Sequence, residues 1–185
     1  MAVKTFTSGE VLTALDTNTY LANSGLVHVA QVVASNSATV AVNNCFSSTY
    51  DAYKIVITEW SSSLAAGARM VLGSTTTGYY WSGLFVDYLG AITSPAGTNQ
   101  AYFNFNFVTD GTTNGSGGII ELQNPYLARN TTMQSAGTDN RTTGAFVRLS
   151  GGYLANLTSY TGFTFFGSSG NQTCRINVYG YRKGN

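Results

Sequence analysis

The stretch Tyr102-Phe-Asn-Phe-Asn-Phe-Val108 decides the fold class, because apolar and polar residues alternate along it without interruption. Successive side chains of a β-strand point to opposite faces of its sheet, so alternation with a period of two predicts a half-buried strand. We therefore expect Phe103, Phe105 and Phe107 to face a hydrophobic core. The two asparagines between them are expected to face away from it.

A second stretch, Tyr53-Lys-Ile-Val-Ile-Thr-Glu-Trp60, follows the same rule. Tyr53, Ile55 and Ile57 share one face of this predicted strand, and the residues between them share the other. Further short runs rich in β-branched and aromatic residues are bounded by Gly, Ser, Thr and Asn, which favour turns. These additional predicted strands are residues 26–33, 39–42, 68–72, 79–89, 118–123, 144–149, 162–166 and 173–181.

Roughly nine to eleven short strands joined by turns are typical of an antiparallel β-sandwich or barrel. The chain is therefore predicted to be all-β, with a jelly roll of two sheets as the commonest way to close it. Asp110-Gly111, Asp139-Asn140 and the glycine-rich stretch Gly115–Gly118 are expected to be turns, and Gly83 is expected to be a bulge within its strand.

Residues 1–25 differ from the β-rich remainder. Thr13 followed by Asp16 is typical of a helix start, and this helix is expected to end near Asn23. Because a helix of about ten residues is marginal in water, it is expected to dock on a sister subunit or a larger assembly. The predicted organisation is an anchoring arm followed by a β-sandwich domain over residues 26–185. The expected assembly residues of the arm are Leu12, Leu15, Tyr20 and Leu21.

The composition excludes several classes of protein. Charged residues make up 9% of the 185 residues and the formal net charge is +1, whereas a nucleic-acid-binding surface needs clustered positive charge. No apolar run approaches the roughly 18 residues of a transmembrane helix, and we see no secretory signal at the start. Cys45 and Cys174 are therefore expected to be buried free thiols, with a disulfide as the alternative.

The sequence offers little catalytic chemistry. Its one histidine, His28, lies in a valine-rich predicted strand and is expected at a surface or an interface. No pair of Cys or His residues has metal-ligand spacing, and no nucleotide-binding or hydrolase motif is present. Asp87 is the one acid in an aromatic setting, and nothing further supports a carboxylate pair or a calcium site. We expect a protein that is not an enzyme, with no catalytic or metal-binding residues and no cofactor.

Aromatic residues are the remaining candidates for function. Tyr79-Tyr80-Trp81 and the pair Tyr179 and Tyr181 stand out among residues rich in amides and hydroxyls. Aromatic side chains supply contact area in protein interfaces, and they also suit sugar rings. These residues are expected to be core or intersubunit residues, with glycan contact as the alternative. Because few charges keep copies of the chain apart, we expect self-association with closed symmetry.

Two segments resemble structural proteins of tailed bacteriophages. Thr5-Phe-Thr-Ser-Gly-Glu-Val-Leu-Thr-Ala-Leu-Asp-Thr-Asn-Thr-Tyr-Leu-Ala-Asn23 is similar to the amino-terminal segment of their minor tail and fibre-like proteins. Asn44-Cys-Phe-Ser-Ser-Thr-Tyr-Asp-Ala-Tyr-Lys-Ile-Val-Ile57 is similar to the segment that enters their first long β-strand. Together the segments cover about 33 residues and contain no catalytic residue.

The resemblance implies a virion component that is assembled in the host cytoplasm. It favours a tail fibre or tail-tip appendage, held by the arm, whose sandwich projects outward and contacts host-surface glycans. The alternative is a capsid decoration protein that stabilises the head, and a further one is a polysaccharide-degrading tail enzyme. Three-fold symmetry is common among such proteins, so the resemblance implies a homotrimer with the arm and the aromatic residues at the shared axis. Its partners would be sister chains and other virion proteins, without nucleic-acid binding or membrane insertion.

Overall fold

The computed structural model describes residues 7–11, 13, 25–111, 115–141 and 144–183. The described residues form thirteen β-strands and no helix, so the all-β prediction is confirmed. The helix predicted from Thr13 to about Asn23 lies outside the described residues, apart from Thr13 itself. The arm residues Leu12, Leu15, Tyr20 and Leu21 lie outside them as well.

Most strands coincide with predicted ones, whereas β6, β7 and β10 are not predicted by the sequence pattern. The strands are β1 (Leu26–Ser37), β2 (Thr39–Val42), β3 (Tyr50–Ser62), β4 (Ala65–Leu72), β5 (Tyr79–Asp87), β6 (Ile92–Thr93), β7 (Ala96–Gln100), β8 (Phe103–Asp110), β9 (Ser116–Gln123), β10 (Thr131–Arg141), β11 (Gly144–Leu154), β12 (Phe163–Gly167) and β13 (Gln172–Arg182).

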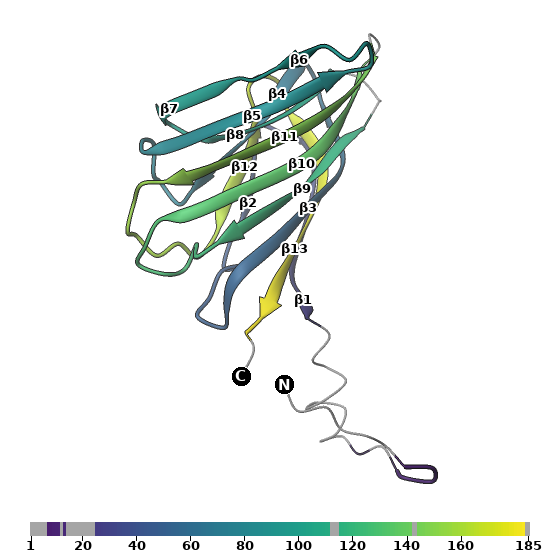
Figure 1. Cartoon of the computed structure of the whole chain (residues 1–185), viewed down its shortest axis with the longest axis vertical. Helices are drawn as coiled ribbons and strands as arrows, with labels where there is room; N and C mark the ends of the chain where they lie inside the picture. The colour runs from purple at the N-terminus through teal and green to yellow at the C-terminus, as the bar shows by residue number, and fades with distance from the viewer. Residues whose placement is uncertain (1–6, 12, 14–24, 112–114, 142–143, 184–185) are drawn as a thin grey trace.

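The strands pair into two antiparallel sheets (Figure 1). The large sheet has nine strands in the order β1-β13-β3-β9-β10-β11-β5-β6, with β7 also paired to β5. The small sheet has four strands in the order β2-β12-β4-β8. Buried side chains of both sheets form one hydrophobic cluster, in which Trp60 of β3 meets Phe165 of β12 at a ring-centroid distance of 5.6 Å. The two sheets therefore pack face to face as a β-sandwich.

The two stretches that predict the fold lie in this core as expected. Each fully buried aromatic or aliphatic side chain contributes roughly 1.5–3 kcal/mol relative to an exposed one, so these strands supply much of the stability. The buried residues that they contribute are Phe103, Phe105 and Phe107 of β8 and Tyr53, Ile55 and Ile57 of β3.

Asn106 is an exception to the predicted alternation. It was expected to face outward, but it is only 7% exposed and has a φ of 60°. A Cβ added at Gly83 of β5 would collide with the Asn106 amide, so the glycine leaves room for this side chain. The bulge predicted at Gly83 is absent from the pairing with β11, because the register between Tyr79 and Asp87 is continuous.

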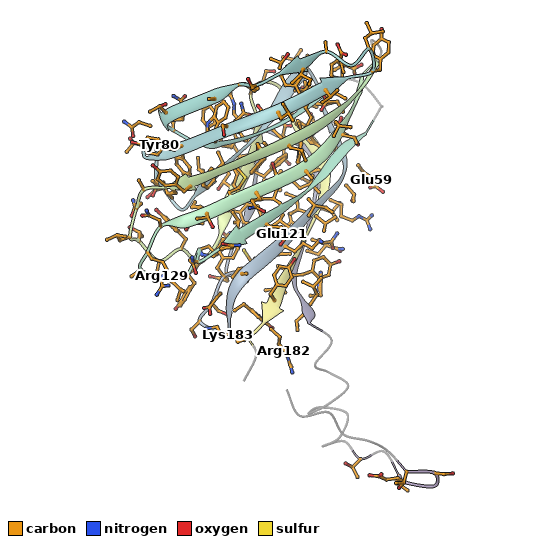
Figure 2. The ribbon with its side chains drawn as sticks, in the orientation of Figure 1. Glu59, Tyr80, Glu121, Arg129, Arg182 and Lys183 are labelled. Atoms are coloured by element: carbon orange, nitrogen blue, oxygen red, sulfur yellow. The ribbon has the colours of Figure 1, made fainter. Side chains whose placement is uncertain are left out.

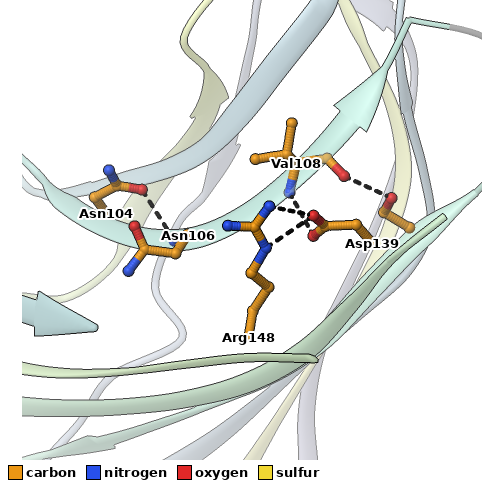
Figure 3. A network of polar contacts seen from close by, with 6 residues as sticks. Asn104, Asn106, Val108, Asp139 and Arg148 are labelled. Carbon is orange, nitrogen blue, oxygen red and sulfur yellow. Dashed lines mark hydrogen bonds and ion pairs between the residues drawn. The ribbon is translucent and has the colours of Figure 1, made fainter. Parts of the chain in front are cut away.

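β8 is an edge strand of the small sheet, and side chains of the large sheet satisfy its free backbone groups (Figure 3). The backbone N–H of Val108 donates to Asp139 Oδ1 at 3.0 Å, and its carbonyl oxygen accepts from Ser116 Oγ at 2.9 Å. The carbonyl oxygen of Asn104 accepts from Ser150 Oγ at 3.2 Å. Because these bonds occupy groups that another strand would need, this edge is closed to further pairing.

The turn predicted at Asp139-Asn140 is wrong, because both residues lie within β10. Asp139 is buried and forms an ion pair with Arg148 of β11, whose Nη2 and Nε lie 2.6 and 2.8 Å from Asp139 Oδ2. The Arg148 guanidinium also lies 4.1 Å from the centre of the Phe85 ring. Both buried charges are thus paired and hydrogen-bonded, as burial in a sandwich interior requires.

The glycine-rich stretch is also not the flexible turn that the sequence predicts. Gly117 and Gly118 lie inside β9. A Cβ added at Gly118, or at Gly137 of the neighbouring β10, would collide with the Phe107 ring. These glycines therefore let a large aromatic side chain of the small sheet pack directly against the backbone of the large sheet.

Both cysteines are buried free thiols, as predicted. Burial raises the pKa of the Cys45 thiol to about 12 and that of Cys174 to about 11. Since the thiolate is the reactive form of cysteine, neither side chain is reactive at neutral pH in the folded protein.

Candidate interaction face

The outer face of the large sheet carries apolar side chains that lie directly opposite one another on four neighbouring strands. Ile119 of β9 pairs with Ala136 of β10, and Ala136 pairs with Leu149 of β11. Leu149 in turn pairs with Leu84 of β5. Directly opposed side chains have Cβ atoms about 4.5–5.5 Å apart. These four residues therefore form one continuous strip, here called the apolar row.

The apolar row is accessible to a partner. Leu149 is 45% exposed, and Val147, two residues away on the same face, is 55% exposed. The row borders a shallow depression of about 510 Å³. Contiguous exposed apolar surface of this kind marks interaction sites in soluble proteins. Residues that line the depression include Ile119, Glu121, Gln134, Ala136, Leu149 and Gly151.

A polar strip lies beside the apolar row on the same face, around Glu121 (Figure 2). Glu121 Oε1 lies 3.5 Å from Lys54 Nζ and accepts a hydrogen bond from Tyr181 Oη at 2.8 Å. Burial, together with this hydrogen bond, raises the pKa of Tyr181 to about 12. Tyr179 and His28 continue the strip in an edge-to-face contact with a centroid distance of 5.4 Å. The strip combines aromatic faces with charged groups.

Tyr79 and Trp81 lie on the inner side of β5, where Tyr79 is buried and Trp81 is partly buried. Tyr79 is fully buried, and its Oη accepts a hydrogen bond from the backbone N–H of Leu72 at 2.8 Å. Burial raises the pKa of Tyr79. Trp81 lies on the same side of β5, and its ring packs against Gly97 of β7. The suggested interface or glycan role is therefore corrected for Tyr79 alone. Trp81 is partly buried, and it lies on the side of β5 opposite to Tyr80, because consecutive residues of a strand point to opposite faces.

Tyr80 does lie on the outer face, where its ring stacks on that of Tyr153 at a centroid distance of 5.0 Å and an interplanar angle of 8°. Tyr179 and Tyr181 lie on the same face, but β13 is five strand positions from β5. At about 4.8 Å per strand, the two groups of tyrosines are roughly 24 Å apart. Figure 2 accordingly shows Tyr80 well separated from Glu121. The predicted aromatic residues do not form one site.

Asp87 and His28 are the acid and the histidine that were considered for catalysis. Asp87 Oδ1 accepts hydrogen bonds from the backbone N–H groups of Leu89 and Ala91, at 2.9 and 2.8 Å, and so holds a turn together. His28 lies exposed on β1. Among the described residues, no group of three or more His, Cys, Asp or Glu side chains could hold a metal ion. That part of the chain also has no helix long and apolar enough to cross a membrane.

The arrangement of the outer face suits the docking of a partner: an apolar row for contact area and a polar strip for orientation. None of the four residues of the apolar row is among the functional candidates that are predicted from the sequence. The chain matches no protein-family model, no curated protein and no solved structure.

Proposed function

We propose that this chain is a non-enzymatic structural protein of a tailed-bacteriophage virion, a tail fibre or tail-tip appendage attached by its amino-terminal arm. The single observation that carries the proposal is the exposed apolar row on an otherwise weakly charged β-sandwich, since such a surface is suited to an assembled particle. The two sequence segments that resemble phage structural proteins give the proposal its biological setting. Host-surface glycans would contact the polar strip around Tyr179.

The proposal includes a finer description of the fold. The orders β1-β13-β3-β9 and β2-β12-β4-β8 are consistent with a jelly roll of eight strands. Two insertions, β5 to β7 and β10 with β11, extend one of its sheets. Three of the four residues of the apolar row, Ala136, Leu149 and Leu84, lie on these inserted strands. The insertions would thus have added a docking surface to a standard sandwich.

The arm is proposed to provide attachment to the particle. The backbone N–H of Arg182 donates to the carbonyl oxygen of Gly25 at 2.9 Å, so the arm joins the sandwich at the corner where β13 ends (Figure 1). A chain that starts at Leu26 keeps all the described strands of both sheets. We expect it to fold with an unchanged far-ultraviolet spectrum and to be lost from purified particles, as measured by quantitative mass spectrometry. Incorporation at the level of the full chain would contradict the anchoring role.

Imaging of particles that carry a labelled chain would locate the protein. Label on the tail supports the appendage, and label on the head supports the alternative of a decoration protein. Release of sugar from host polysaccharide by the purified chain would contradict the non-enzymatic proposal.

The apolar row is proposed to hold a homotrimer together. Leu149→Lys places a charge at its centre, where burial in an interface would be costly, and the long lysine stem leaves the isolated fold intact. We expect the mass measured by light scattering at 10 μM (roughly the range of moderate protein affinities) to fall to that of a smaller species. The matched control is Leu157→Lys, which adds the same charge at an exposed loop leucine. An equal loss of mass in both variants would argue against a specific role of the row.

A further inference from the structure

The edges of the two sheets are not equally protected against pairing with another strand. In the small sheet, β2 has four residues, and β8 has its backbone groups occupied by side chains. In the large sheet, one edge is formed by β6 and β7, with two and five residues. The other edge is β1, which has twelve residues and no described strand on its outer side. Short or covered edges resist pairing, whereas a long open edge favours it.

The composition of β1 adds to this difference. Its sequence, Leu-Val-His-Val-Ala-Gln-Val-Val-Ala-Ser-Asn-Ser, contains no Asp, Glu, Lys, Arg, Pro or Gly. Natural edge strands are usually guarded by charges, proline or bulges, and an uncharged apolar edge strand invites association. β1 lacks charges and proline, and its two irregularities leave residues 30–34 regular. Val33, in the middle of β1, is 64% exposed. Among the described strands, β1 therefore forms the one long open edge, and its side chains do not oppose pairing.

Irregularities in β1 define the part of the edge that can pair. The register with β13 shifts between His28 and Ala30 and again between Ala34 and Ser37. Between these shifts, residues 30–34 are regularly paired on their inner side. Bulges interrupt a ladder of hydrogen bonds, so a new strand would add along this regular run. Val32 is its central residue.

We propose that β1 pairs antiparallel with β1 of a second copy of this chain, about a two-fold axis that passes near Val32. Among the described strands, β1 is the one long open edge, so the matching edge that a second copy offers is its own β1. An antiparallel pair of identical strands is isologous and brings no like charges together here. The pairing joins two large sheets into one continuous sheet. It does not depend on the proposed virion role.

The first test of the edge pairing adds charge to β1. Gln31→Glu with Val33→Glu places two carboxylates of each chain at the shared edge. The carboxylate at 33 lies opposite Arg175 of its own β13, so the isolated fold is retained. We expect the mass by light scattering to be halved relative to the full-length chain. The uncharged control, Gln31→Thr with Val33→Thr, is expected to keep the original mass, because threonine favours strands.

A second test measures the register by cross-linking. A two-fold axis near Val32 places residue 31 of one copy opposite residue 33 of the other, within the Cα separation of about 7 Å that a disulfide spans. An equimolar mixture of Gln31→Cys and Val33→Cys chains should therefore cross-link more completely under mild oxidation than either chain alone. The native thiols do not interfere, since Cys45 and Cys174 are buried.

The masses separate this inference from the proposed trimer. If both contacts exist, the full chain forms six copies, the charged β1 variant three, and Leu149→Lys two. If only the edge pairs, the full chain is a dimer that Leu149→Lys leaves unchanged. A full chain of one or three copies, or one in which the 31–33 mixture shows no preferential cross-link, overturns the inference. Those results would mean that the arm or another protein covers the edge, or that it stays open.

Discussion

Replacement of Phe105 by aspartate is expected to abolish cooperative folding. Phe105 of β8 is fully buried, and its ring lies 5.9 Å from that of Phe107. Loss of a buried phenylalanine alone costs about 3–5 kcal/mol, and an unpaired carboxylate in an apolar layer adds several more. Because domains of this kind are stable by roughly 5–15 kcal/mol in total, the variant should be insoluble or unfolded. Circular dichroism during heating measures this directly.

The matched control for Phe105→Asp is Asn104→Asp on the same strand. Asn104 is only partly buried, and its side-chain oxygen accepts a hydrogen bond from the backbone N–H of Asn106 at 3.0 Å, a role that a carboxylate can keep. The control should melt cooperatively within a few degrees of the unchanged protein. A soluble Phe105→Asp chain with a normal melting transition would mean that the core is assigned to the wrong residues.

The strands that the sequence predicts correctly are those whose inward faces are apolar. The alternation around Tyr53 and Phe105 is a local pattern, and burial in the sandwich follows from it directly. β10 is not predicted, because its inward face carries Ser135 and Asp139 next to Met133. Asp139 bonds β8 and Arg148, and Ser135 bonds Ser150, so neither joins the apolar cluster. A polar strand that completes a buried network is not recognisable from its own sequence.

The aromatic candidates show a second limit of prediction from the sequence. Tyr79, Tyr80 and Trp81 are adjacent in the sequence, and treating them as one surface disregards the two-residue period of a strand. The same period would have placed Tyr179 and Tyr181 together, as the structure does. Glu121, which bonds Tyr181, comes from a strand 60 positions away in the chain, and no local pattern identifies such a partner.

The apolar row and the open edge of β1 depend on long-range pairing. Ile119, Leu149 and Leu84 become neighbours only through the registers of β9, β10, β11 and β5. Within β11, Val147 and Leu149 alternate with Phe146 and Arg148. Because apolar residues lie on both faces of β11, its sequence indicates that the outer face is not exposed to water alone. Which strand lies at a sheet edge is a property of the strand order, which sequence periodicity does not contain.

Replacement of Arg148 by methionine is expected to lower the free energy of unfolding by about 3–5 kcal/mol, as measured by urea denaturation. The change removes the cation that is paired with Asp139 while the carboxylate remains buried, and removal of one partner of a buried ion pair costs about this much. Methionine nearly fills the volume of the arginine stem between Phe85 and Phe146, so a cavity contributes little to the result.

The double variant Asp139→Asn with Arg148→Met separates the charge from the backbone contact. Asparagine at 139 keeps an oxygen that can accept from the Val108 N–H, so the β8 edge stays closed while both charges are gone. Replacing a buried ion pair as a whole is often close to neutral, and we expect the double variant to recover more than half of the stability lost in Arg148→Met. A double-mutant cycle measures the coupling energy. Additive losses would show that the pair is not coupled, and that Arg148 stabilises the fold through its aromatic contacts alone.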